Sequence, residues 1–163
     1  MKTIVFVRHA KSSWTDINMS DYDRPLDDRG VRDAPVMAAR LAAEGLDIGL
    51  LITSGANRAR STARYFEKEL GLPLSETREL YHGMPEDYLQ QLHMVDDKVP
   101  GVALFGHNPG ITYLANMIEP DCTDNVPTCG ILIAVSEADR WQDVDFRSMK
   151  LVKMMVPKDK DHG

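Results

Sequence analysis

Two arginines and two histidines each stand just beyond an apolar stretch of the sequence, and they are Arg8, His9, Arg58 and His107. A guanidinium group is a planar fork of N–H donors that fits a phosphate or a carboxylate. A neutral imidazole can act as a nucleophile and form a covalent intermediate. Taken together, these side chains could bind an oxyanion and attack it. Taken alone, Arg8 could instead pair with a surface acid, and His9 could be a buried histidine at a strand end.

Four unbroken apolar runs predict the strands that would position these side chains. The runs lie at residues 3–7, 48–54, 101–105 and 131–135. Continuous runs rich in Val, Ile and Leu are typical of strands that are buried on both faces, as in parallel sheets. Two weaker segments, 73–80 and 149–156, predict further strands. The first of them contains a proline and several charges, which is typical of a sheet edge.

A polar segment and a helix separate the first two of these runs. Residues 16–30 are dense in Asp, Arg and Pro and predict a long loop, of a kind that is usually functional or covering. The helix that follows is expected to begin at an Asp33 N-cap, with Pro35 in its first turn, and to stop at Gly45. The alternative is an earlier start with a kink at Pro35.

Three more helices are predicted farther along the chain, at 56–70, from Pro85 and after Gly110. Strands and helices therefore alternate along the sequence. This alternation predicts an α/β fold, a three-layer sandwich with a mostly parallel central sheet flanked by helices.

Three of the predicted strands lead into basic or polar residues. The first ends at Arg8-His9, the second leads into Ser54 and Arg58, and the third ends at Gly106-His107-Asn108. The carboxyl ends of parallel strands lie at one edge of the sheet, which is where open α/β sheets bind their ligands. Residues that are about fifty positions apart in the sequence should therefore meet. Such a meeting predicts an oxyanion pocket with a nucleophile inside it.

Composition limits the possible partners and locations. The chain has 163 residues and a net charge of −6, which disfavours nucleic acid or an anionic membrane as a partner. Two cysteines are too few for a disulfide framework, and no secretion leader is visible, so a cytoplasmic location is expected. One catalytic domain is predicted over residues 1–157, followed by a polar tail at 158–163, and the protein is expected to be a monomer.

Three motifs carry a resemblance to a known family. They are Arg8-His9-Ala10, the segment SGANRARSTA at 54–63, and Gly106-His107-Asn108. In this order and at these separations they resemble the motifs of the histidine phosphatase superfamily, whose fold is shared with phosphoglycerate mutases. The short chain, the Arg24-Pro25-Leu26 loop and the segment 127–130 before a strand are similar to the SixA-type phosphohistidine phosphatases within it.

The resemblance implies a role for each residue of the pocket. His9 would be the nucleophile, with its second ring nitrogen held by a backbone carbonyl, and Arg8 and Arg58 would bind the phosphoryl oxygens. His107 would be catalytic in its protonated form, and Ser12 and Asn108 are candidates for further contacts with the substrate. No metal and no cofactor is implied.

The sequence departs from the larger family members where they carry a general acid. Those that act on alcohol phosphates need a carboxylic acid to protonate the leaving oxygen. In the corresponding segment this chain offers His82, Glu79 and Glu86, of which Glu79 is interpreted as a solvated charge and His82 as a loop histidine. An imidazole leaves a phosphoramidate more easily than an alkoxide leaves an ester. The missing acid therefore favours a phosphohistidine substrate. The two tryptophans, Trp14 and Trp141, are interpreted as packing residues.

The sequence thus predicts a metal-independent phosphohistidine phosphatase that acts on a phosphorylated protein through a covalent intermediate on His9. One alternative is a phosphomonoesterase that acts on small molecules. The other is a module that binds a phosphorylated ligand without turning it over.

Overall fold

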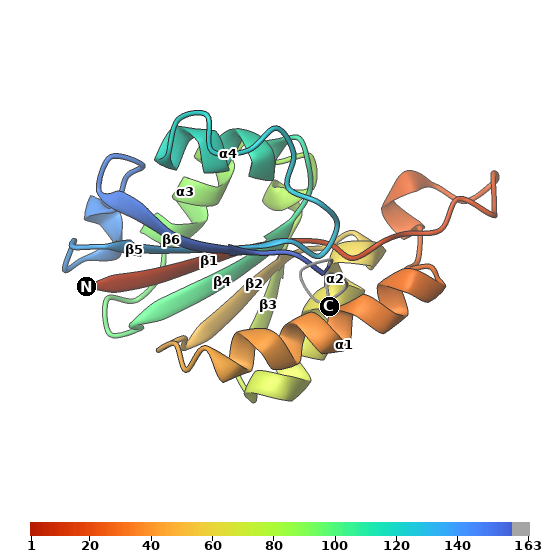
Figure 1. Ribbon diagram of the computed structural model, residues 1–163, viewed down its shortest axis with the longest axis horizontal. Helices are drawn as coiled ribbons and strands as arrows, with labels where there is room; N and C mark the ends of the chain where they lie inside the picture. The colour runs from red at the N-terminus through yellow and green to blue at the C-terminus, as the bar shows by residue number, and fades with distance from the viewer. Residues whose placement is uncertain (158–163) are drawn as a thin grey trace.

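One mixed sheet forms the centre of the protein (Figure 1). The computed structural model describes residues 1–157, so the predicted polar tail at 158–163 lies outside the described residues. The strand order is β3-β2-β4-β1-β5-β6. The strands are β1 (Lys2–Arg8), β2 (Leu50–Ser54), β3 (Leu74–Thr77), β4 (Gly101–Gly106), β5 (Ile131–Ser136) and β6 (Met149–Met155). Strands β1 to β4 pair in parallel, whereas β5 runs antiparallel to both β1 and β6. The predicted mostly parallel sheet is confirmed, with β3 at its edge.

Helices cover both faces of this sheet, as the predicted sandwich requires (Figure 1). They are α1 (Asp28–Ala43), α2 (Asn57–Leu70), α3 (Pro85–His93) and α4 (Gly110–Ile118). Residues 1–157 also contain three short 3-10 helices: η1 (Asp21–Asp23), η2 (Arg78–Leu80) and η3 (Trp141–Asp143). Helices α1 and α2 lie on one face, and α3 and α4 lie on the other (Figure 1).

Alternate residues of the central strand β1 enter two separate hydrophobic cores. Ile4 and Phe6 pack with the apolar residues of α3 and α4, whereas Val5 and Val7 pack with those of α1 and α2. All four side chains are fully buried. Successive side chains of a strand point to opposite faces, so a strand covered on both sides must be apolar at every position. This requirement explains the unbroken apolar runs of the sequence.

Helix α1 begins earlier than the sequence predicts, and the expected Asp33 N-cap is wrong. The N-cap is Asp27, whose side chain accepts a hydrogen bond from the Gly30 N–H at 2.8 Å. Pro35 therefore lies inside the helix rather than in its first turn. The loop predicted over 16–30 is correspondingly shorter and contains the 3-10 helix η1. The polar composition of this segment hides the helix start, because Asp is common both in loops and at N-caps.

The register of the parallel strands brings their carboxyl ends level. Arg8 lies opposite Gly106 across the β1–β4 pair, and Thr53 lies opposite Phe105 across the β2–β4 pair. The residues that follow these three strands therefore emerge side by side at one edge of the sheet. No helix among residues 1–157 is long and apolar enough to cross a membrane.

Candidate active site

A cavity of about 280 Å³ lies beyond the carboxyl ends of β1, β2 and β4. All six site residues predicted from the sequence line it: Arg8, His9, Ser12, Arg58, His107 and Asn108. The imidazole rings of His9 and His107 have centroids 5.2 Å apart. The expected convergence of residues from three distant segments is therefore present.

His9 is held in the tautomer that a nucleophile needs. Its Nδ1 lies 2.7 Å from the Ala10 carbonyl oxygen, and because a carbonyl can only accept, Nδ1 must carry the proton. The Nε2 lone pair is then available for attack. The pKa of His9 is lowered to about 3, mainly by burial. The Ala10 hydrogen bond opposes this shift, and the charges of Arg58, Arg8 and Arg24 add to it. His9 is therefore neutral at neutral pH, as nucleophilic attack requires.

Arg58 is fixed by an aspartate that the sequence analysis did not single out. It extends from the first turn of α2, and its Nη1 and Nη2 donate to the backbone oxygen and to Oδ2 of Asp21, at 2.6 and 3.0 Å. Its buried Nε has no hydrogen-bond partner among residues 1–157. One edge of the guanidinium is thus anchored, while the buried Nε remains unused by the protein.

Asp21 connects three side chains of the site. Its Oδ2 also accepts a hydrogen bond from the Tyr81 hydroxyl at 2.7 Å, and Arg24 Nε lies 3.1 Å from its Oδ1. Burial opposes ionisation of this carboxyl group. The hydrogen bonds from Tyr81, Arg58 and Arg24 outweigh burial and hold the pKa of Asp21 well below its usual range. Asp21 is therefore a permanent carboxylate that orients the arginines.

Arg24 forms a buried part of the cavity wall, although in the sequence it belongs to the polar loop. Its Nη1 donates to the Ser12 hydroxyl oxygen, and its guanidinium stacks 3.5 Å above the Trp14 ring. Trp14 lines the cavity and is 69% exposed, so its interpretation as a packing residue is wrong. Trp141, by contrast, is fully buried, as predicted. The loop sequence gives no apolar periodicity from which these contacts could have been inferred.

Arg8 and Asn108 are both tied to the segment that precedes β5. Arg8 Nη1 donates to the Val126 carbonyl at 3.0 Å, and its buried Nε has no partner within residues 1–157. The Asn108 amide nitrogen donates to Asn125 Oδ1 and to the Val126 carbonyl, while its oxygen accepts two hydrogen bonds from Thr112. Asn108 lines the cavity, but these contacts favour a positioning role for its side chain.

His107 is positioned by one contact of its ring and one contact of its backbone. Its Nε2 lies 2.8 Å from Ser54 Oγ, and its backbone N–H donates to the Tyr88 hydroxyl at 3.1 Å. Burial, followed by the charges of His9, Arg58 and His82, lowers the pKa of His107 far below its ordinary value. The surrounding protein thus favours a neutral ring rather than the protonated form expected from the sequence. A phosphoryl dianion in the cavity would raise this pKa, because an opposite charge favours the imidazolium.

The three candidate acids are placed very differently. His82 lines the cavity and its ring lies against that of Tyr81, with centroids 4.0 Å apart. Glu79 and Glu86 are exposed and are not part of the cavity wall. Among residues 1–157, the one carboxylate lining the cavity is Asp21, which is already ionised. The site therefore offers no protonated carboxylic acid.

Residues 4–86 match the model of the histidine phosphatase superfamily (branch 1). The chain belongs to the histidine phosphatase superfamily. This membership supports a phosphatase as the general class of activity. The predicted superfamily is thereby confirmed, and the matched segment contains Arg8, His9 and Arg58.

Individual relatives extend the comparison over the whole chain. The uncharacterised protein ML1117 of Mycobacterium leprae is 30% identical over 93% of this chain and all of its own length. A phosphoglycerate mutase of Azorhizobium caulinodans is 38% identical, but over only 44% of this chain and 35% of its own. A structure of the protein histidine phosphatase SixA with tungstate superposes with a TM-score of 0.80 and 22% identity, covering 97% of this chain and 99% of that one. The predicted SixA-type fold is thereby confirmed.

Proposed function

We propose that this histidine phosphatase hydrolyses phosphohistidine on a protein, through a phosphoryl intermediate on His9. One observation carries the proposal. The cavity combines a neutral histidine with arginines, yet its one carboxylate among residues 1–157, Asp21, is ionised and bound to two of those arginines. Such a site can receive a phosphoryl group but has no carboxylic acid to protonate an alcohol leaving group.

The first step is transfer of the phosphoryl group to the enzyme. A bond forms between His9 Nε2 and phosphorus while the substrate's P–N bond breaks, and its electron pair goes to the substrate imidazole. The second ring nitrogen of the substrate takes a proton from solvent before the P–N bond breaks, so the ring leaves as neutral imidazole and not as an imidazolate anion. Because the conjugate acid of imidazole has a pKa of about 6.5, neutral imidazole is a good leaving group at neutral pH. Arg8 and Arg58 bind the phosphoryl oxygens and stabilise the charge that they carry in the transition state.

The second step returns the enzyme to its starting state. Water attacks phosphorus, the P–Nε2 bond breaks, and its electron pair goes back to His9, while the water proton passes to solvent. The Ala10 carbonyl holds the Nδ1 proton throughout, so His9 leaves as a neutral imidazole. Inorganic phosphate is released. None of these steps uses a metal ion.

The comparisons support the same substrate class. The SixA structure that shares this fold is that of a protein histidine phosphatase, and it contains tungstate, a tetrahedral oxyanion like phosphate. An oxyanion is the ligand that the arginines of the present cavity would bind. The expected monomeric state and cytoplasmic location remain predictions.

The proposal is tested by comparing kcat/KM for a phosphohistidine-bearing protein domain with kcat/KM for phosphoserine and sugar phosphate esters. We expect at least a hundredfold preference for phosphohistidine. His9→Asn should abolish turnover. His93 lies on α3 outside the cavity, where its Nε2 is 2.7 Å from the Val144 carbonyl oxygen, so His93→Asn should retain turnover. Ester hydrolysis as fast as phosphohistidine hydrolysis would overturn the substrate assignment. Full activity of His9→Asn would overturn the mechanism.

A phosphomonoesterase remains the second candidate because His82 lines the cavity. A protonated imidazole there could supply the proton that an alkoxide leaving group requires. In that case His82→Gln would lower ester hydrolysis more than tenfold and leave phosphohistidine hydrolysis nearly unchanged. The phosphohistidine proposal predicts slow ester hydrolysis in both proteins.

A further inference from the structure

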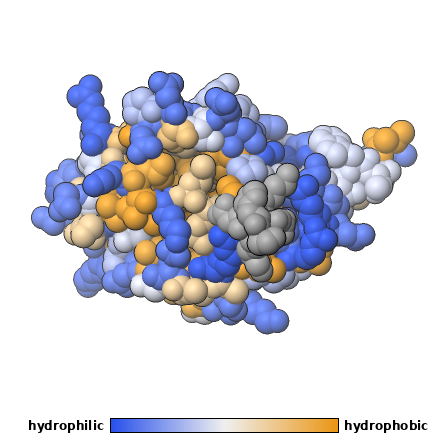
Figure 2. All heavy atoms as spheres, in the orientation of Figure 1, coloured by the Kyte–Doolittle hydropathy of each residue, from blue (hydrophilic) through white to orange (hydrophobic). Residues whose placement is uncertain are grey.

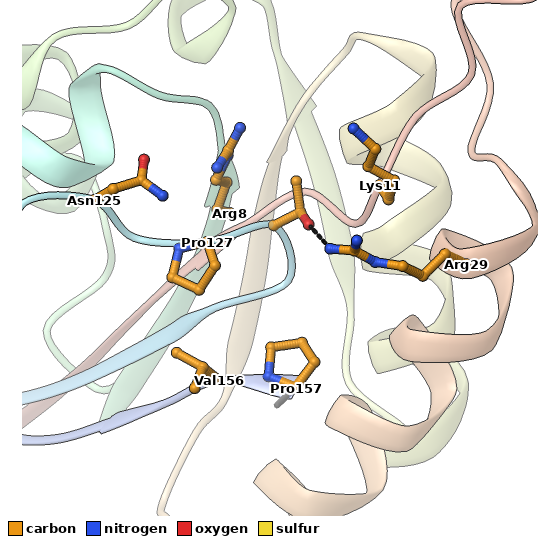
Figure 3. A pocket seen from close by; sticks show the side chains of 8 residues that line it. Arg8, Lys11, Arg29, Asn125, Pro127, Val156 and Pro157 are labelled. Atoms are coloured by element: carbon orange, nitrogen blue, oxygen red, sulfur yellow. Dashed lines mark hydrogen bonds between the residues drawn. The ribbon is translucent and has the colours of Figure 1, made fainter. Parts of the chain in front are cut away.

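A second cavity of about 300 Å³ lies next to the candidate active site (Figure 3). The two cavities share Arg8, Lys11 and Thr128 as walls. The second is completed by Arg29, Asn125, Pro127, Val156 and Pro157. It therefore opens where a group attached to the phosphorylated residue, or close to it in the substrate, would lie.

Two cations that the proposed reaction does not use line this second cavity. Arg29 reaches from α1 toward the loop before β5 (Figure 3), where its Nη2 donates to Thr128 Oγ1 at 3.2 Å. Its Nε lies 3.6 Å from Asp33 Oδ2. Lys11 has no hydrogen bond or ion pair from its ammonium group to any other residue of the part of the chain that the structure describes. A lysine without a partner at a cavity wall is available to a ligand.

The chain holds these two cations beside each other through its backbone. The Lys11 carbonyl accepts a hydrogen bond from the Asp27 N–H at 2.9 Å, just before α1 begins. Gly30 packs so closely on the same carbonyl that a Cβ atom there would clash with its oxygen. The first turn of α1 is thus fixed against Lys11, and Arg29 stands in that turn. These contacts fix the backbone positions from which the Lys11 and Arg29 side chains extend to the same cavity.

The net charge of the second cavity indicates which anion it would bind. Arg8 also lines this cavity, but its charge is assigned to the phosphoryl group in the first cavity. Lys11 and Arg29 then contribute two positive charges and the nearby Asp33 one negative charge, so one positive charge remains for a second anion. One positive charge matches a carboxylate better than a phosphate dianion. Arginine and lysine both bind carboxylates, and the arginine fork adds directional hydrogen bonds.

We propose that this second cavity binds a carboxylate of the substrate protein that lies beside the phosphohistidine. The inference rests on the proposed function and extends it to substrate choice. An acidic residue next to the phosphohistidine would interact with Arg29 and Lys11 while the phosphoryl group occupies the first cavity. Since the protein as a whole carries a charge of −6, a local cationic site would let it accept an acidic partner that its overall charge repels.

Binding of small phosphonates tests this proposal without any turnover. The probes are methylphosphonate, which has one oxyanion, and phosphonoacetate, 3-phosphonopropionate and 4-phosphonobutyrate, which add a carboxylate at increasing distance. We expect the best carboxylate probe to bind at least tenfold more tightly than methylphosphonate by calorimetry. Arg29→Gln should reduce this ratio to below threefold. Arg32→Gln should retain it, because Arg32 also lies near Asp33 but does not line the cavity.

Three outcomes would overturn the proposal. The first is equal affinity for all four probes, and the second is the same ratio in Arg29→Gln as in the parent. The third is tighter binding of ethylene bisphosphonate than of any carboxylate probe, which would assign the second cavity to another phosphate. None of these measurements involves hydrolysis. A failure of the second cavity to bind a carboxylate can therefore be distinguished from a failure of the enzyme to hydrolyse phosphohistidine.

Hydrolysis of two phosphohistidine peptides tests the same proposal with peptide substrates. One peptide has Asp and Glu beside the phosphohistidine, and the other has Asn and Gln at the same positions. We expect kcat/KM to be about tenfold higher for the acidic peptide, and the ratio to fall toward one in Arg29→Gln. Hydrolysis of both peptides at equal rates by the parent would contradict the second site alone. Hydrolysis of neither would contradict the proposed function.

Discussion

His9 and His107 lie 5.2 Å apart between ring centroids, and the protein around them keeps both neutral. Burial is the largest cause, and the neighbouring arginines add to it. The same arginines that would bind a phosphoryl group therefore also keep the nucleophile unprotonated. One arrangement of charge thus serves both the binding of the substrate and the reactivity of His9.

The buried neutral His9 makes stability depend on pH. Its pKa is about 3 in the folded protein, against 6.5 for a histidine in an unfolded chain, so between these values the unfolded chain binds more protons. The free energy of unfolding should therefore rise with pH across this window, by up to about 1.4 kcal/mol per pH unit from this group. Urea unfolding at several pH values measures the slope. His9→Asn should lower this slope without abolishing it, because the buried His107, whose pKa is also lowered, still contributes. An equal slope in the parent and in His9→Asn would contradict a low pKa for His9.

Asp21 is a residue of the candidate active site that could not be identified from the sequence. We expect Asp21→Asn to lower kcat/KM by roughly ten- to a hundredfold, because misplacement of a binding group by a fraction of an ångström has effects of this order. Asp16→Asn, an exposed position on the same loop, is the matched control and should change kcat/KM less than twofold. Steady-state kinetics of the two variants decide the matter. Equal effects would show that the loop charge, rather than the contact with Arg58, is responsible.

At the scale of elements, the sequence predicted the strands well because their apolar runs are a local signal. Ile4 to Val7 are buried on both faces, and no other element tolerates such a run as readily. Because these strands were predicted to be parallel, the carboxyl ends of β1, β2 and β4 were expected at one edge of the sheet. His9, Arg58 and His107 were therefore expected to lie close together. These inferences needed only the parallel direction of the strands.

The parts that the sequence could not predict depend on contacts between distant segments. The start of α1 depends on the Asp27 cap and on the close approach of Gly30 to Lys11. The role of Asp21 depends on Arg58 and Tyr81, which follow it by 37 and 60 positions. Neither contact leaves a periodic pattern in the sequence. The exposed position of Trp14 was missed for the same reason.

Gly106, at the end of β4, provides a test at the scale of elements. A Cβ atom there would clash with the Tyr88 hydroxyl oxygen, which accepts the His107 N–H. We expect Gly106→Ala to reduce the free energy of unfolding by about 1–3 kcal/mol, as overpacking does, and to lower kcat. Urea unfolding and steady-state kinetics measure the two effects.

The matched control for this substitution is Gly71→Ala. Gly71 closes α2 with φ +66 and has no atom close to the position of its Cβ within 4 Å. Backbone strain of about 1–2 kcal/mol is expected there, with no change in kcat. Loss of activity in both variants would indicate that general destabilisation, rather than displacement of Tyr88 and His107, explains the effect at Gly106.

In the molecule as a whole, an acidic protein places five of its cationic side chains around two adjoining cavities: Arg8, Lys11, Arg24, Arg29 and Arg58. The loop at 13–20 projects beside them, and Figure 2 shows apolar atoms at its tip, where Ile17 is 91% exposed. The remaining apolar residues lie mainly in the two cores on either side of the sheet. Since β1 contributes side chains to both cores, the stability of each core is expected to depend on the other.

This dependence predicts a single cooperative unfolding transition, as one domain over 1–157 should give. Far-UV circular dichroism follows the helices, and tryptophan fluorescence follows Trp141, which is fully buried. Trp14→Phe removes the signal of the exposed tryptophan. The urea midpoints from the two measurements should coincide. Two separated midpoints would contradict a single domain and indicate that the cores unfold independently.

The most direct test of the proposed mechanism is to capture the phosphoryl group on its way through the enzyme. A radiolabelled phosphohistidine protein is mixed with the enzyme for milliseconds, quenched in alkali, and the labelled site is mapped by mass spectrometry. We predict label on His9, at Nε2, because the Ala10 carbonyl occupies the Nδ1 side. His9→Asn should show neither label nor turnover. Label on another residue, or continued hydrolysis by His9→Asn, would contradict the mechanism.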